Sequence, residues 1–232
     1  MRKALLLFFL SYPCLLFPQS KSDIGVLGGG TYYMGDINPS TPFYSPGYNF
    51  GVNYRYNINS RYVLKGEMNY LTLSANDANF TDSYQRARGM SFASKIIDYA
   101  AQFEFNFLPI KFVERKVFFS PFVSAGLGVA QVLNATGLSS IGSIGSSTPK
   151  TINFVVPFSL GARISLGEKW SVGFEWNMRK TFTDNLDGVQ NMIAPSMRSI
   201  FNNNDWYYFY GLFFTYKIFE FPGECPAYGI DH

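Results

Sequence analysis

The 232-residue sequence has few charged residues, one histidine, two cysteines and no long apolar run. Charged residues make up 15% of the chain, whereas an ordinary soluble domain has about 25%. No stretch reaches the roughly 18 consecutive apolar residues that a membrane-spanning helix needs. The low charge therefore argues against a protein surrounded only by water, and the missing apolar run argues against a membrane crossing made of helices.

The single histidine, His232, is the last residue. Barrel enzymes that cleave lipids or peptides generally need a histidine base, so its position removes Ser-His and His-Asp catalysis. It also leaves no His or Cys cluster for a transition metal. The segment from Thr183 to Gly188 resembles part of a calcium loop, but aligning Gly188 at the sixth position places Ala194 at the twelfth, where a glutamate is needed. The sequence predicts no enzyme, no metal site and no cofactor.

The N-terminal residues 1–20 form a predicted secretory signal peptide, because Arg2 and Lys3 precede an apolar run from Ala4 to Leu10. Cleavage is expected within residues 18–22. Its removal takes away two basic residues, so 19 − 2 = 17 Lys and Arg stand against 16 acids, a net charge of +1. A mature chain this close to neutral offers no basic surface for nucleic acid.

Cys225 is the one cysteine left once the signal peptide, which contains Cys14, is removed. In an oxidising compartment an odd cysteine either pairs with another protein or stays a free thiol near a chain end. Both interpretations stay open at this point.

Aromatic residues, by contrast, make up 19% of the chain and recur at every second position. The pattern is clearest from Lys95 to Leu108, where one face is apolar and the other mixes carboxylate, amide and alanine. The apolar face reads Ile97, Tyr99, Ala101, Phe103, Phe105 and Phe107, and the other reads Ile96, Asp98, Ala100, Gln102, Glu104 and Asn106. A period of two predicts a strand, and this chemistry is typical of a strand with lipid outside and a packed polar interior.

The same alternation recurs in about eight segments, which are residues 23–35, 48–56, 62–70, 95–108, 117–132, 153–166, 170–179 and 206–219. Strands in hydrocarbon must close on themselves, because unpaired backbone groups at an open edge cost several kcal/mol each. The connections alternate between long and short, as in bacterial barrels with short periplasmic turns and long external loops. The sequence therefore predicts an all-β protein, an eight-stranded antiparallel transmembrane β-barrel over residues 21–219, in the bacterial outer membrane with both termini periplasmic.

The first predicted strand is rich in glycine, and we expect its glycines to let neighbouring interior side chains approach closely. Tyr32, Tyr33 and Met34 suit a membrane interface. The triplet from Gly28 to Gly30 lacks the GxGxxG spacing, because position 33 is tyrosine, so a nucleotide-binding loop is rejected.

Charged residues on the inward faces of these strands are nearly balanced in sign. They are Arg55, Lys65, Glu67, Asp98, Glu104, Arg163, Glu175, Arg179 and Lys217. An eight-stranded barrel is only wide enough for side chains to fill it, so bulk permeation is not expected. The charges form either a selective polar path or a set of mutually neutralising buried pairs, and the second interpretation is favoured.

Four local patterns resemble the PorG family, small outer-membrane barrels of the type IX secretion system of Bacteroidetes. They are Tyr32 to Pro39 (YYMGDINP), Arg179 to Asp187 (RKTFTDNLD), Asp205 to Tyr207 (DWY) and Cys225 to Tyr228 (CPAY). The resemblance spans the mature chain. It implies a component of the protein secretion machinery associated with a periplasmic ring made of a lipoprotein and its partner, PorK and PorN. Cargo export and, in some members, gliding motility would depend on it.

Residues 220–232 form a predicted periplasmic tail, in which two prolines lower the entropy lost on binding. Combined with the resemblance, the tail is hypothesised to dock on the ring, with or without a disulfide at Cys225. The predicted partner-binding residues are Cys225, Pro226, Ala227 and Tyr228. A disordered chain end is the other interpretation. The alternative function is a stand-alone structural barrel of the OmpA or OmpW type, or a small-solute channel.

Overall fold

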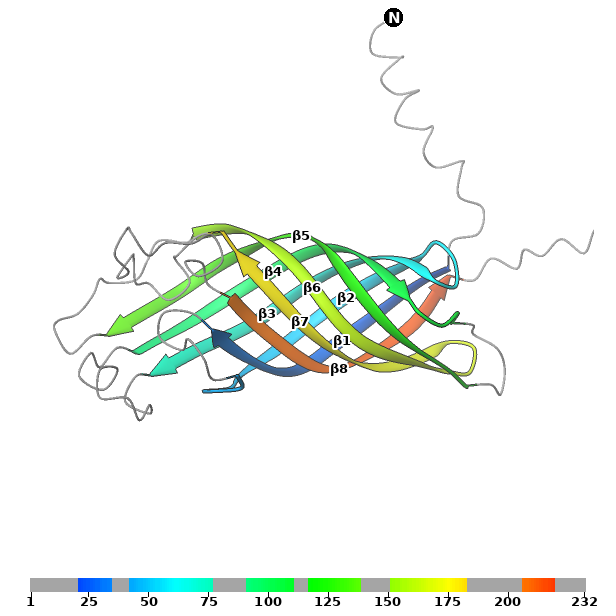
Figure 1. Ribbon diagram of the computed structural model, residues 1–232, viewed down its shortest axis with the longest axis horizontal. Coiled ribbons are helices and arrows are strands. Elements are labelled where there is room, and N and C mark those ends of the chain that lie inside the picture. The colour runs from blue at the N-terminus through cyan, green and yellow to red at the C-terminus, as the bar shows by residue number, and fades with distance from the viewer. Residues whose placement is uncertain are drawn as a thin grey trace, which may run out of the picture.

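The computed structural model describes residues 21–34, 42–76, 91–110, 117–138, 151–182 and 206–219. Eight strands in chain order form a closed barrel (Figure 1). They are β1 (Lys21–Met34), β2 (Gly47–Asn57), β3 (Tyr62–Asn76), β4 (Ser91–Asn106), β5 (Val117–Leu138), β6 (Thr151–Leu166), β7 (Trp170–Thr181) and β8 (Trp206–Phe219). All neighbours pair antiparallel, including β1 with β8. The predicted fold class is confirmed. In the described ranges no helix could span a membrane.

The register of the strands fixes the stagger of the barrel. A path of paired residues that leaves β1 at Ser22 returns to β1 at Tyr32, ten positions farther along (32 − 22 = 10). The path runs through Tyr56, Leu64, Phe103, Ala125, Phe158, Met178 and Tyr208. Closed barrels with such a stagger have strands tilted by roughly 35–45°, and the oblique strands are visible in Figure 1.

The two ends of the barrel differ in their connections. The tight turns at residues 58–61 and 167–169, the start of β1 and the end of β8 all lie at one end, here called the short-turn end (Figure 1). Asn59 closes the first turn, because its Oδ1 accepts the backbone N–H groups of Arg61 and Tyr62 at 2.8 Å. Gly167 opens the second with a φ of 74°, which glycine adopts without strain. The longer connections define the loop end.

The two faces of the strands are distributed as the alternation predicts. On β4, Asp98 and Glu104 are buried inside the barrel, while Tyr99 and Phe103 are 42% and 47% exposed on its outer wall. Large apolar side chains are exposed on the outer faces of all eight strands. Water-soluble proteins rarely expose a continuous apolar surface of more than a few hundred Å². The outer wall is therefore built to contact hydrocarbon.

Aromatic side chains on the outer wall gather in two girdles, as expected at the two interfaces of a bilayer. The girdle toward the short-turn end includes Tyr56, Tyr62, Phe105, Trp170 and Tyr216, and the girdle toward the loop end includes Tyr48, Tyr70, Trp176, Trp206 and Tyr208. Within the second girdle, Trp176 Nε1 donates to the Tyr32 hydroxyl at 3.1 Å, and Tyr32 stacks on Tyr208.

Three strands extend at least four residues farther toward the loop end than the sequence pattern predicted. β3 continues to Asn76 rather than residue 70, β4 begins at Ser91 rather than residue 95, and β5 continues to Leu138 rather than residue 132. The alternation is inverted there, because Leu73 and Ala75 point inward while the outward positions are polar. Tyr33 is a second correction, since it is fully buried inside the barrel rather than at the membrane interface. Its ring meets Phe92 edge to face at 4.7 Å.

Candidate functional site

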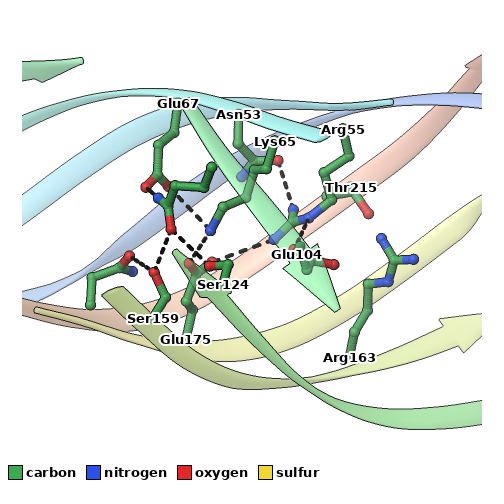
Figure 2. A network of polar contacts seen from close by, with 12 residues as sticks. Asn53, Arg55, Lys65, Glu67, Glu104, Ser124, Ser159, Arg163, Glu175 and Thr215 are labelled. Carbon is green, nitrogen blue, oxygen red and sulfur yellow. Dashed lines mark hydrogen bonds and ion pairs between the residues drawn. The ribbon is translucent and has the colours of Figure 1, made fainter. Parts of the chain in front are cut away.

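The lumen toward the short-turn end is filled by charged side chains, and we call this part the polar zone. The structure places all nine predicted interior charges inside the barrel: Arg55, Lys65, Glu67, Asp98, Glu104, Arg163, Glu175, Arg179 and Lys217, each at most 8% exposed. Figure 2 shows six of them, Arg55, Lys65, Glu67, Glu104, Arg163 and Glu175, converging from strands far apart in sequence. Asp23 of β1 is a tenth member, which the sequence pattern missed because glycines blur the alternation of that strand.

Arg55 lies near the middle of the polar zone and holds three partners. Its Nε donates to Glu104 at 3.2 Å, its Nη2 to Glu175 at 3.4 Å and its Nη1 to Asn53 at 2.8 Å. These partners come from β4, β7 and β2, so one guanidinium links three strands across the lumen (Figure 2). All of its charged partners are fully buried as well. A buried charge with this many partners avoids the cost of an unpaired ion.

Lys65 connects two carboxylates. Its Nζ bonds to Glu175 and lies 3.6 Å from Glu67. Glu175 also forms an ion pair with Arg55, and Glu67 also forms one with Arg179. These charges therefore form one continuous chain rather than separate pairs. Removal of one member would therefore leave more than one neighbour without its partner.

Arg179 ends this chain on the side of the loops. Its Nε lies 3.3 Å from Asp98 and its Nη2 bonds to Glu67. Asp98 also accepts the hydroxyl of Tyr207 at 2.6 Å. At the opposite end of the polar zone, Arg163 Nη1 lies 3.4 Å from Asp23. Opposite charges therefore neutralise one another in the lumen, as the favoured interpretation of the sequence expects, but most of them are joined in a chain, beside which Arg163 pairs with Asp23.

Uncharged polar groups complete the network. Gln102 Nε2 donates to Glu67, and its Oε1 accepts the hydroxyls of Ser124 at 2.7 Å and Ser159 at 2.9 Å. Ser159 also bonds to Asn177, which in turn accepts Arg179 Nη1 at 3.1 Å. Since these residues belong to five strands, the network ties the wall of the barrel together from within.

Aromatic rings pack against the buried guanidinium groups. Arg55 Cζ lies 4.4 Å from the ring centre of Phe213, and Arg179 Cζ lies 4.7 Å from that of Phe209. Such cation–π contacts are attractive, especially where water is excluded. The rings fit because glycines face them: a Cβ at Gly173 would lie 2.4 Å from Phe213. The expected close approach also holds in β1, where a Cβ at Gly25 would lie 2.4 Å from Thr215 Cγ2.

The lumen toward the loop end is lined mainly by apolar side chains, and we call it the apolar zone. Its buried members are Tyr33, Leu71, Leu73, Ala75, Phe92, Ile96, Ala130, Val132 and Val155. Each is at most 3% exposed. The alternation of the strands predicts a polar interior throughout, so this zone is a finding of the structure. Together the two zones leave the interior of the described barrel filled by its own side chains.

Two buried asparagines differ from the network above. Neither the nitrogen nor the oxygen of the side-chain amide has a hydrogen-bond partner in Asn49, 3% exposed on β2, or in Asn153, 1% exposed on β6. An unpaired buried amide costs free energy, so these positions contrast with Asn177, whose oxygen has two donors.

The remaining predicted site residues are in the tail. Cys225, Pro226, Ala227 and Tyr228 lie outside the described residues, as do residues 1–20. In the part of the chain that the structure describes, no group of three or more His, Cys, Asp or Glu side chains could hold a metal ion.

Solved structures with a similar fold include three bacterial proteins. Ail, the attachment invasion locus protein of Yersinia pestis, in complex with the heparin analogue sucrose octasulfate, shares 14% identity at a TM-score of 0.45, covering 86% of this chain and 99% of that chain. Neisserial surface protein A shares 10% identity at a TM-score of 0.49, covering 86% of this chain and 97% of that chain. The outer membrane protein OprG from Pseudomonas aeruginosa shares 10% identity at a TM-score of 0.41, covering 86% of this chain and 97% of that chain.

No curated protein matches the sequence. One family model does, over residues 2–228, and its description is a domain of unknown function. The match covers nearly all of the chain, including every strand of the barrel. The protein therefore belongs to the family described as Domain of unknown function (DUF6089).

Proposed function

We propose that this protein is a non-enzymatic anchor in the bacterial outer membrane, and that it docks the periplasmic ring of the type IX protein secretion machinery to that membrane. The observation that supports an anchor is the filled lumen: paired charges occupy one zone and apolar side chains the other. Eight-stranded barrels have room for side chains and little else. A rigid, filled barrel suits attachment better than transport.

The link to type IX secretion is supported by the four sequence patterns that resemble the PorG family. The fold adds that β1 begins and β8 ends at the same end of the barrel. In the proposal this end faces the periplasm, so residues 220–232 leave the barrel on the side where a ring of the PorK and PorN type would stand. The tail is then the docking segment.

Affinity purification of the tagged full-length protein from detergent-solubilised outer membranes tests this role. The expected result is co-purification of a periplasmic lipoprotein and its partner, with loss of both when residues 220–232 are deleted. Secretion of cargo should fall in the same deletion strain. A barrel that purifies alone, with normal secretion, would instead support the stand-alone structural barrel.

The covalent form of the proposal depends on Cys225. Non-reducing electrophoresis of purified outer membranes should show a band of higher mass that disappears in Cys225→Ser and under reducing conditions. If the wild type and Cys225→Ser give the same bands while co-purification is intact, docking stands and the disulfide is excluded.

Planar-bilayer recording separates the anchor from a small-solute channel. The purified wild-type barrel is expected to show no steady conductance, because charged and apolar side chains fill its lumen in series. Stable single-channel steps in the wild type would contradict the anchor and favour the channel.

A further inference from the structure

Two adjoining hollows lie on the outer wall of the barrel, over the strands from β2 to β6. Their volumes are about 580 and 620 Å³, and their lining is almost wholly apolar. Both are lined by Gly66, Ala101 and Leu127, so they form one depression. We call it the wall groove. It belongs to the surface that faces the membrane and is separate from the polar and apolar zones of the lumen.

The groove is produced by the register of small residues. Gly66 of β3 pairs with Ala101 of β4, and a Cβ added at Gly66 would meet nothing within 4 Å. The neighbouring rows carry large side chains, which are the pairs Leu64 with Phe103 and Met68 with Tyr99. Two small residues between two rows of large ones leave a floor between ridges. The hollow is therefore built into the strands and does not depend on the loops.

The position of the groove relative to the membrane follows from β3. Tyr62 belongs to the girdle at the short-turn end and Tyr70 to the girdle at the loop end, and Gly66 lies four residues from each. Aromatic girdles mark the two interfaces of the bilayer. The floor of the groove is thus at mid-membrane, where the surrounding medium is hydrocarbon.

We propose that the wall groove binds one acyl chain of a membrane lipid. A lipid chain reaches mid-membrane, needs no hydrogen-bond partner and adapts to an irregular hollow. In the groove it contacts the floor and both ridges, so it gains more dispersion contacts than on a convex wall. The groove continues the lipid-facing surface of the barrel and offers a protein partner almost no polar group. This inference goes beyond the proposed anchoring role and does not depend on it.

Native mass spectrometry of the full-length protein, extracted in mild detergent and reconstituted with phosphatidylethanolamine, tests the proposal. The wild type is expected to retain one lipid per barrel. Gly66→Phe places a ring on the floor of the groove and should lower that retained fraction at least tenfold. Ala101→Phe fills the same hollow from β4 and should act alike, which covers the case in which one variant folds poorly.

Gly28→Phe is the matched control, because Gly28 also faces outward and a Cβ there also meets nothing within 4 Å. It lies on β1, away from the groove, and should retain lipid as the wild type does. Equal lipid retention in the wild type, Gly66→Phe and Ala101→Phe would overturn the proposal. So would a wild-type dimer that Gly66→Phe converts to monomers, since a second copy would then be the occupant.

Discussion

The two zones of the lumen are equally buried and chemically opposite. Arg55 and Glu104 in the polar zone are fully buried, and so are Leu71 and Ile96 in the apolar zone. Burial therefore does not explain the difference. What differs is the outer wall: around the polar zone it carries large apolar side chains, whereas beside Leu73 and Ala75 it carries polar residues.

This comparison shows where the bilayer ends. Within the membrane the outer wall must be apolar, so the polar side chains are placed in the lumen and must pair with one another. Beyond the girdle at the loop end, β3, β4 and β5 meet water, and the hydrophobic effect again drives apolar side chains inward. Along a single strand the outward side chains change from apolar to polar and the inward side chains from polar to apolar, and this change marks the boundary of the membrane.

The zones should also respond differently to substitution. A buried ion is stabilised by specific partners, so loss of one partner leaves an uncompensated charge. An apolar side chain is stabilised by all its neighbours, so its truncation costs in proportion to the cavity left. Equilibrium unfolding by guanidinium of the barrel in lipid vesicles can measure both effects, with the three native tryptophans as the fluorescent probe.

Glu175→Gln is expected to give the largest effect, a loss of about 3–5 kcal/mol in the free energy of unfolding. The substitution keeps the shape of the side chain but removes the charge that Arg55 and Lys65 share. Glu168→Gln, in the exposed turn between β6 and β7, is the control and should change stability by less than about 0.5 kcal/mol. Similar midpoints for both variants would show that the chain of charges does not stabilise the barrel.

Leu71→Ala probes the apolar zone and should cost about 2–5 kcal/mol, the range for a leucine truncated in a packed core. Leu71 is fully buried among the apolar zone residues, so the cavity cannot be filled by solvent from outside. Leu64→Ala, on the lipid-facing wall of the same strand, is the control, and it should cost less because lipid chains can occupy the space. A cost at Leu71 no greater than at Leu64 would mean that the apolar zone is loosely packed.

Ala101→Arg and Ala93→Arg test the boundary itself. Both alanines are on β4 and both are exposed on its outer face. At mid-membrane, Ala101→Arg should cost about 2–4 kcal/mol, whereas a site at or beyond the interface should cost about 0–1 kcal/mol. Equal costs at the two positions would mean that the bilayer does not lie between the two aromatic girdles. They would also contradict the conclusion that β4 lies outside the membrane at Ala93.

The sequence alone predicted much of this barrel, for a simple reason. A period of two assigns each residue of a strand to one of two faces, so Tyr99 and Phe103 outside and Asp98 and Glu104 inside followed directly from the alternation. The nine interior charges followed from the same rule. Tight turns such as that around Asn59 were visible as short polar breaks between alternating segments.

The apolar zone could not be predicted by that rule. It assumes that apolar residues face lipid, but β8 is apolar on both faces, with Phe209 and Phe213 inward and Leu212 and Phe214 outward. A continuous apolar run does not distinguish lumen from lipid. The pairing of charges was also out of reach, because Lys65 meets Glu175, 110 residues away. That contact depends on the stagger of the closed barrel, which no local pattern encodes.

The smallest effects are expected from two asparagines that look alike in sequence. Asn177→Leu should lower the free energy of unfolding by about 1–3 kcal/mol, because it leaves Nη1 of the buried Arg179 without the amide oxygen that accepts its hydrogen bond. Asn49→Leu should instead raise it by about 1 kcal/mol, since the amide of Asn49 has no partner to lose and an apolar side chain of similar size removes its desolvation cost. The sign of the change at Asn49 is the decisive measurement. A loss of stability there would mean that buried water satisfies the amide, and the lumen beside Leu71, the residue paired with Asn49, would then be hydrated rather than dry.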